Sequence, residues 1–197
     1  MEQPVDLNAA AKTWRTMVES SQATLLRKSG HDVAWWAGQC RAAGLADDAG
    51  VRAWLRDRHG ITGYAQYAVS WEMFGYPDFM LRDAGELFDA QYAGHPELRV
   101  IASALLAWAA ETGGVQIQLR KGYVSLHSTR RKFAQITRAN SSCVDIALRI
   151  EAPAEGLLEA VNARAGDPFV RRIRLRAGTA VSGSVLAVLA QALRQNS

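Results

Sequence analysis

The sequence predicts an α+β protein in which an N-terminal helical module precedes a helix-flanked, mainly antiparallel β-sheet module. Three observations carry this prediction. Apolar residues recur at three- and four-residue spacing through the first half of the chain, as they do on amphipathic helices. In the second half, apolar and polar residues alternate in four short segments, which is the period of a half-buried strand. The turn-rich run Gly75-Tyr76-Pro77-Asp78 separates the two patterns, so we place the modules at residues 1–76 and 77–197.

Four helices are expected in the first module, because capping residues precede each apolar-periodic stretch and glycines follow it. The expected spans are about 7–28, 32–44, 47–60 and 62–74. Asp32 is the expected cap of the second helix, Asp47 or Asp48 of the third, and Thr62 of the fourth.

The second module is expected to begin with two helices, one capped by Asp78 and continuing through Phe88, and a longer one after His95-Pro96. The alternating segments then lie at 115–127, 132–138, 143–150 and 170–177, with a weaker strand at 157–161. A last helix over about 181–193 has an apolar face that suits the apolar side of the sheet.

Composition is that of an ordered globular protein, with 49% hydrophobic and 21% charged residues. The N-terminus has no basic region followed by an apolar run, so we expect no secretory signal and a cytoplasmic protein. The longest apolar stretch, Ala180–Leu193, is too short to span about 30 Å of hydrocarbon, so no membrane span is expected. Cys40 and Cys143 are expected to be reduced, buried thiols.

Positive charge is concentrated in the alternating segments. Residues 115–150 and 170–177 contain eleven bases and a single acid, Asp145, which we expect to pair with Arg149 or with an arginine of a neighbouring strand. Such a surface suits an anionic partner. The alternative is that the charges only keep an exposed sheet face soluble and discourage its edge strands from pairing with other strands.

One row of this block has the chemistry of an anion site. Lys121, Tyr123 and Ser125 are two residues apart, so their ammonium, phenol and hydroxyl groups are expected on one sheet face, where they could donate together to a phosphate or carboxylate. Arg172 or Arg174 from another strand could complete the site, because guanidinium groups bind oxyanions in bidentate fashion.

The helical module supplies a second candidate site. Trp35 and Trp36 are adjacent and cannot face the same side of a helix, so one of them is expected to be exposed, at the module interface or in a ligand pocket. His59 and Tyr64 flank a short glycine-bounded turn and could form a proton-transfer or ligand-binding pair. Helix capping by His59 is the structural alternative.

Recognised catalytic and metal-binding spacings do not occur in the chain. The sequence has no phosphate-binding glycine loop, no dinucleotide fingerprint, no His-Glu-x-x-His and no Cys-x-x-Cys. None of the four histidines forms a pair at helical ligand spacing, so we expect neither a metal nor a cofactor. Among them, His127 continues the row of alternate residues that contains Ser125.

Two stretches resemble families of bacterial proteins. The Trp35-Trp36 pair, with Trp54-Leu55 leading into His59-Gly60, resembles a small helical module, domain-of-unknown-function family 4287. The runs Arg120–Leu126 and Val144–Leu148 resemble domain-of-unknown-function family 5655, and the order of the two modules is the same. The resemblance covers about residues 7–195 and implies no particular reaction, but the second family is similar to segments fused to restriction-type nucleases, which points toward nucleic acid.

We therefore predict a non-enzymatic binding protein whose basic sheet face contacts an anionic partner, nucleic acid in the first place. One alternative is a small-molecule-binding protein, for sequestration or resistance, with an aromatic pocket between the modules. The other is an enzyme of unrecognised type that uses His59 and Tyr64, or Lys121 and Tyr123.

Overall fold

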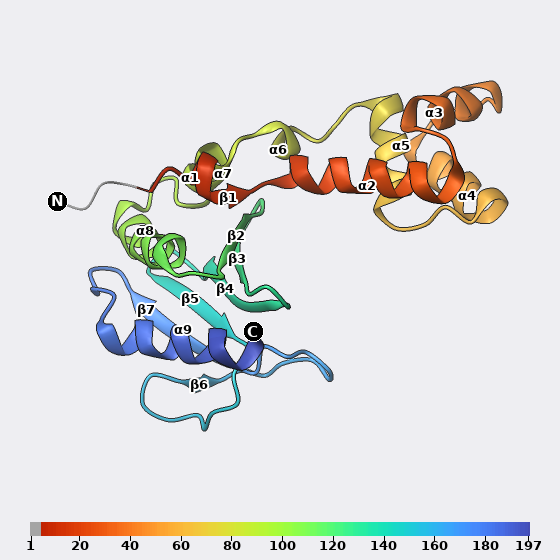
Figure 1. Ribbon diagram of the computed structural model, residues 1–197. Coiled ribbons are helices and arrows are strands. Elements are labelled where there is room, and N and C mark those ends of the chain that lie inside the picture. Colours follow the sequence, from red (N-terminus) through yellow and green to blue (C-terminus); the bar gives the residue numbers. More distant parts are fainter. Residues whose placement is uncertain (1–4) are drawn as a thin grey trace. The chain divides into compact units, whose positions relative to one another are not determined.

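The computed structural model describes residues 5–197, which form two compact units (Figure 1). The helical unit is Thr13–Arg82, and the sheet unit consists of Asp83–Ser197 together with the described residues up to Lys12. The helical unit is therefore an insertion within the sequence of the sheet unit. The units divide the chain after residue 82, whereas the sequence suggested a division after residue 76.

The N-terminal segment does not continue into the first long helix. It forms α1 (Leu7–Ala10) and β1 (Ala11–Lys12), and α2 (Trp14–Ser29) begins only after Thr13, whose backbone is extended. The single helix expected over 7–28 is therefore wrong in its N-terminal part. The end of that helix is correct, since the left-handed Gly30 stops α2.

Tertiary hydrogen bonds account for this departure. β1 pairs in parallel with β2 (Gln116–Leu119), which satisfies backbone groups that a continuous helix would have satisfied internally. The Asn8 Oδ1 atom accepts hydrogen bonds from the backbone N–H groups of Ala84 and Gly85 at 2.9 and 3.1 Å. These contacts join the N-terminal segment to the sheet unit.

The helical unit contains α2 and four further helices: α3 (Val33–Ala42), α4 (Asp48–His59), α5 (Tyr64–Phe74) and α6 (Asp78–Leu81). Asp32 and Asp47 cap α3 and α4 through their side chains, as predicted. The prediction that Thr62 caps α5 is wrong, because the residue before the helix is Gly63 in a positive-φ conformation.

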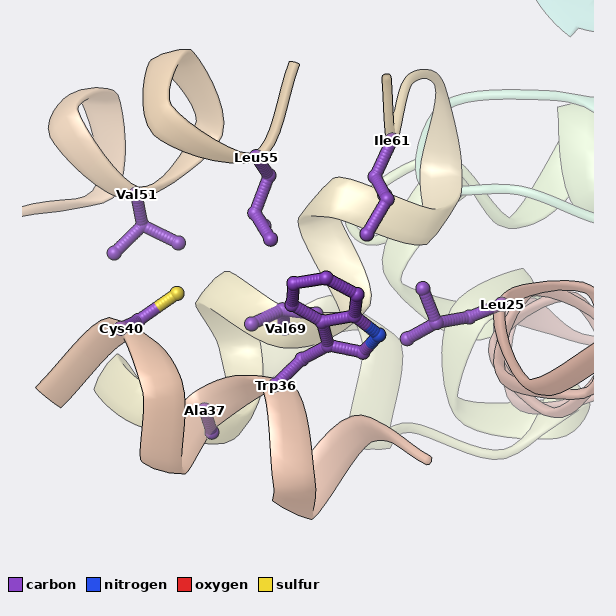
Figure 2. Close-up of a cluster of buried hydrophobic side chains, with 8 residues drawn as sticks. All are labelled: Leu25, Trp36, Ala37, Cys40, Val51, Leu55, Ile61 and Val69. Atoms are coloured by element: carbon purple, nitrogen blue, oxygen red, sulfur yellow. The ribbon is translucent and has the colours of Figure 1, made fainter. Parts of the chain in front are cut away.

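A cluster of buried hydrophobic side chains joins four helices of this unit (Figure 2). Its members are Leu25, Trp36, Ala37, Cys40, Val51, Leu55, Ile61 and Val69. The ring of Trp36 lies at the centre of the labelled side chains, and its indole N–H donates to the Ser29 hydroxyl at 2.9 Å. The ring thus buries its apolar surface and satisfies its one donor.

The sheet has seven strands in the order β1-β2-β3-β4-β5-β7-β6, and every neighbouring pair except β1 and β2 is antiparallel. The strands after β2 are β3 (Val124–His127), β4 (Lys132–Arg138), β5 (Cys143–Leu148), β6 (Glu159–Ala160) and β7 (Arg171–Arg176). This confirms the α+β class and the mainly antiparallel sheet. The segment expected as one strand over 115–127 is a hairpin, because residues 120–123 turn the chain.

Three longer helices belong to the sheet unit: α7 (Ala84–Gln91), α8 (Pro96–Glu111) and α9 (Gly183–Asn196). The helix expected from Asp78 through Phe88 is in fact two, α6 and α7. Asp83 separates them, because its backbone is extended and its side chain forms a capping box with Glu86.

The two faces of the sheet differ in chemistry. One face is buried, and α8 contacts β2 and β5 while α9 contacts β4 (Figure 1). Its side chains include Ile117, Leu119, Val124, Leu126, Ala134, Ile136, Val144, Ile146, Leu148 and Ile173. We call the opposite side the polar face; it carries Gln116, Gln118, Ser125, His127, Lys132, Gln135, Thr137, Asp145, Arg172 and Arg174. Across residues 5–197, no helix has the length and apolar character needed to cross a membrane.

Candidate anion-binding face

Strand register brings polar side chains together in rows across the polar face. Gln116 on β2, His127 on β3 and Lys132 on β4 lie opposite one another, and the next row contains Ser125 and Gln135. A register shift beside His127 aligns it with Lys132, as β-bulges re-aim side chains at the end of a pairing.

Lys132 lies between two aromatic rings. Its Nζ atom is 5.0 Å from the centroid of the Tyr123 ring and 4.9 Å from that of Phe169. The ammonium also donates to the Gln135 Oε1 atom at 2.5 Å. These partners attract the ammonium but carry no negative charge, so they leave its positive charge uncompensated.

Three basic side chains, Arg120, His127 and Lys132, share this part of the face, and we call them the basic triad. Burial lowers the pKa of both His127 and Lys132, and the positive charge of Arg120 lowers the two pKa values further. Lys132 itself also lowers the pKa of His127, whereas Asp167 acts in the opposite direction on Lys132. The positive charges of these side chains repel one another, and an anion close to them would reduce this repulsion.

The His127 and Lys132 side chains have no ion-pair partner in the described part of the chain. No carboxylate of residues 5–197 lies within 4.0 Å of the side-chain nitrogens of either residue. Arg120 is oriented by a hydrogen bond of 2.5 Å to the Gln118 side-chain oxygen. Lys132 is therefore positioned by the neutral Gln135 side chain and two aromatic rings.

Arg172 and Arg174 lie on the polar face, and each is paired with acids there. Arg174 donates two hydrogen bonds to the Asp145 carboxylate, at 2.7 and 2.6 Å, which raise the pKa of Arg174. Arg172 donates to Glu159 at 2.8 Å and to Asp145 at 3.4 Å. The expected pairing of Asp145 with a neighbouring-strand arginine is confirmed, and these two arginines offer less charge to a ligand than their number suggests.

The predicted row Lys121, Tyr123 and Ser125 is divided by the hairpin. Lys121 and Tyr123 lie in the turn between β2 and β3, and only Ser125 lies within β3. The Gln91 amide fixes this turn by donating to the carbonyl oxygens of Arg120 and Tyr123 at 2.7 and 3.4 Å. Ser125 is only 3% exposed, whereas Lys121 is exposed and Tyr123 is half-buried.

One tryptophan of the adjacent pair in the helical unit is buried and the other is exposed, as predicted. Trp36 is 6% exposed, whereas Trp35 is 41% exposed and stacks on the His31 ring with 3.7 Å between centroids. The His59 ring lies against Trp36 and Trp54, with centroid distances of 4.8 and 4.3 Å. His59 is also the last residue of α4, where an imidazolium would interact favourably with the helix carbonyls.

Tyr64 lies elsewhere on this unit. Its side chain is 52% exposed, and its ring faces Tyr67 at 6.1 Å between centroids. Within residues 5–197, the ring contacts of His59 are with tryptophans and none is with Tyr64. In the same part of the chain, no group of three or more His, Cys, Asp or Glu side chains is placed to hold a metal ion.

Sequence reasoning did not single out Arg120, Lys132 or Phe169. The first two contributed to the count of bases, and His127 was noted only as the continuation of a row. The hairpin and the register shift that join these residues are long-range features, so strand periodicity contains no sign of them. One feature of the sequence could have indicated the pair of His127 and Lys132: Lys132 begins a predicted strand directly after the turn that follows His127.

Comparisons of the chain with models of known protein families, with curated proteins and with solved structures find no match. The resemblance to two bacterial families therefore stays a prediction.

Proposed function

We propose that this protein binds nucleic acid through the polar face of its sheet and holds backbone phosphates at the basic triad. One observation carries the proposal: Arg120, His127 and Lys132 converge on a partly exposed face, where their charges disfavour one another. A phosphate between them would relieve this repulsion and would release the counterions that accompany the nucleic acid.

The surroundings of the triad favour a polymer over an isolated ion. Gln116 and Gln118 on β2 and Gln135 on β4 present side-chain amides on this face, and amides can donate to and accept from bases and sugars. Tyr123 and Phe169 place aromatic rings beside the triad, and such rings stack on exposed bases. These features fit a single strand with unstacked bases better than a duplex.

The first test is fluorescence anisotropy of a short, labelled, single-stranded oligonucleotide. We expect binding that weakens as salt is raised, and Lys132→Gln is expected to weaken it about tenfold and to reduce the salt slope by about one, because one phosphate contact is lost. Arg99→Gln is the matched control, since it removes the same charge from α8, where Arg99 pairs with Asp89 at 2.6 Å.

Two results would contradict the proposal. One is the absence of affinity for DNA and RNA even at low salt. The other is an equal loss of affinity in Lys132→Gln and Arg99→Gln, which would show that net charge alone is responsible.

The two alternative functions stay predictions. A small-molecule site would involve Trp35 or Trp36 of the helical unit, and quenching of tryptophan fluorescence by a ligand would support it. An enzyme that uses His59 and Tyr64 would need these side chains to approach one another during the reaction.

A further inference from the structure

A pocket of about 320 Å³ lies in the sheet unit, where the last turn of α9 meets the turn between β3 and β4. Arg131 and Arg149 line it, and Ile150, Pro168 and Val170 contribute apolar residues to the lining. The pocket thus combines two basic residues and one acidic residue, Glu151, with a small apolar enclosure, on residues that the polar face does not use.

Hydrogen bonds to the backbone hold the two arginines of this pocket in place. The Ser128 hydroxyl accepts from the backbone N–H of Arg131 at 3.0 Å and donates to the Asn196 carbonyl at 2.6 Å. The Asn196 amide in turn donates to the Arg149 carbonyl at 2.8 Å. Ser128 thus fixes the backbone of Arg131 and Asn196 fixes that of Arg149, and both polar residues are buried.

The Gln195 side chain and the Glu151 backbone, which belong to residues that also line the pocket, are bonded to each other. The Gln195 side chain accepts from the Glu151 backbone N–H at 2.8 Å and donates to the Glu151 carbonyl at 3.3 Å. The Glu151 carboxylate is not within 4.0 Å of the guanidinium nitrogens of Arg131 or Arg149, and neither is any other carboxylate of residues 5–197.

Arg131 shows the clearest need for a ligand. Its Nε atom is buried and has no hydrogen-bond partner in the described chain, and buried donors are nearly always paired in folded proteins. Burial and the positive charges of Arg130 and Arg149 lower the pKa of Arg131. Because a guanidinium group still stays protonated at physiological pH, a bound anion would offset this repulsion.

We propose that this pocket binds a phosphate group, with Arg131 and Arg149 as its ligands. Guanidinium groups bind phosphate oxygens in bidentate fashion, and an Nε–H together with a terminal N–H is one such pair of donors. The volume is at the lower end of the range for small-molecule pockets, so it fits a phosphate with at most a small organic substituent. Free phosphate and the terminal phosphate of a nucleic-acid strand share this chemistry.

The test uses the whole chain and inorganic phosphate. Titration is followed by calorimetry and by the NMR signals of arginine Nε–H groups, and we expect the Arg131 signal to shift with saturation. Arg131→Gln is expected to weaken phosphate binding about tenfold or more, as the loss of a charged hydrogen-bond donor does. Arg130→Gln is the matched control, because Arg130 is exposed, lies in the same turn and does not line the pocket.

Terminally phosphorylated and unphosphorylated oligonucleotides distinguish the two sources of phosphate. A preference for the phosphorylated strand that is lost in Arg131→Gln supports a strand terminus as the ligand, whereas binding of inorganic phosphate without such a preference supports a free phosphate compound. Lys132 belongs to the basic triad and does not line this pocket, so Lys132→Gln should leave the phosphate-dependent shift of the Arg131 Nε–H signal unchanged. Failure of the polar-face proposal and failure of this one are therefore distinguishable.

The proposal is overturned if phosphate leaves the Arg131 Nε–H signal in place, or if Arg130→Gln weakens binding as much as Arg131→Gln. The two arginines would then serve the carbonyl end of α9, where positive charge is favourable. In that case Arg131→Gln would lower the thermal unfolding temperature without any effect on phosphate, and this measurement also shows whether the variant folds.

Discussion

Among single residues, His127 is the most sensitive reporter of the polar face, because imidazole titrates near neutral pH. Its ring is half-buried on β3 beside Lys132, and burial, Lys132 and Arg120 all lower its pKa in the folded protein. The same positive charges that make the face attractive to an anion therefore make protonation of His127 unfavourable while the face is empty.

As the pH falls, titration of His127 is therefore expected to lower the stability of the free protein and to strengthen its binding of an anion. Above about pH 6.5 both the folded and the unfolded chain hold a neutral imidazole. Below it the unfolded chain takes up the proton first, so we expect the free energy of unfolding to decrease. Bound phosphate would raise the pKa of His127, so oligonucleotide affinity should increase over the same range.

Urea unfolding and anisotropy on both sides of pH 6.5 check these two trends. His127→Gln should remove the contribution of this residue to the pH dependence of unfolding and of binding. His95→Gln should retain both pH dependences, because His95 lies outside the basic triad. A pH dependence that is unchanged in His127→Gln would contradict the assignment.

At the level of elements, the pairing of β5 with β7 decides how much charge the polar face presents. The strands place Asp145 directly opposite Arg174, and the carboxylate also lies within reach of Arg172. The Asp145 side chain is 18% exposed, so its interactions are only partly screened by solvent. One acid thus holds two bases of the face in an internal pair.

Asp145→Asn is expected to lower the stability of the sheet and to strengthen oligonucleotide binding at the same time. The amide keeps the size of the carboxylate but loses its charge, so Arg174 loses its acidic partner and becomes available to phosphates, while Arg172 keeps Glu159. A lower urea midpoint, together with an affinity several-fold higher at low salt, is the expected result. Asp89→Asn is the control, because Asp89 pairs with Arg99 on helices and not on the polar face. An unchanged affinity in Asp145→Asn would show that this end of the face takes no part in binding.

At the level of the whole chain, the helical unit is inserted into the sheet unit. Residues before Thr13 supply the edge strand β1 and the Asn8 acceptor for α7, and the chain then leaves for the helical unit and returns at Asp83. The sheet unit is therefore complete only when both parts of its sequence are present.

This organisation predicts how the sheet unit tolerates truncation. A chain in which a short glycine-serine linker replaces residues 13–82 should fold, because both parts of the sheet unit remain. Residues 83–197 alone should be less stable by about 1–3 kcal/mol, since the β1 pairing and the two bonds to Asn8 are lost. Thermal unfolding followed by circular dichroism compares the two chains, and equal stability would show that the N-terminal segment contributes nothing.

Much of the fold follows from the sequence alone. The α+β class, the cap at Asp32 and the division of Trp35 from Trp36 were predicted correctly, and Asp47 is one of the two residues expected to cap the third helix. The physical reason is that helices and half-buried strands impose their own periods on a sequence, and capping satisfies backbone groups within a few residues. The excess of bases in the second half was visible in the same way.

What only the tertiary structure decided is which of those residues meet. The sequence did not show that residues 7–12 leave the first helix to join the sheet, that Lys132 lies beside His127, or that Arg174 is paired with Asp145. Each outcome depends on strand register, and a period-two pattern defines the face of a side chain without specifying its cross-strand partner. The same composition thus predicts a basic sheet, but only the register divides it into arginines paired with acids and a basic triad disposed to bind an anion.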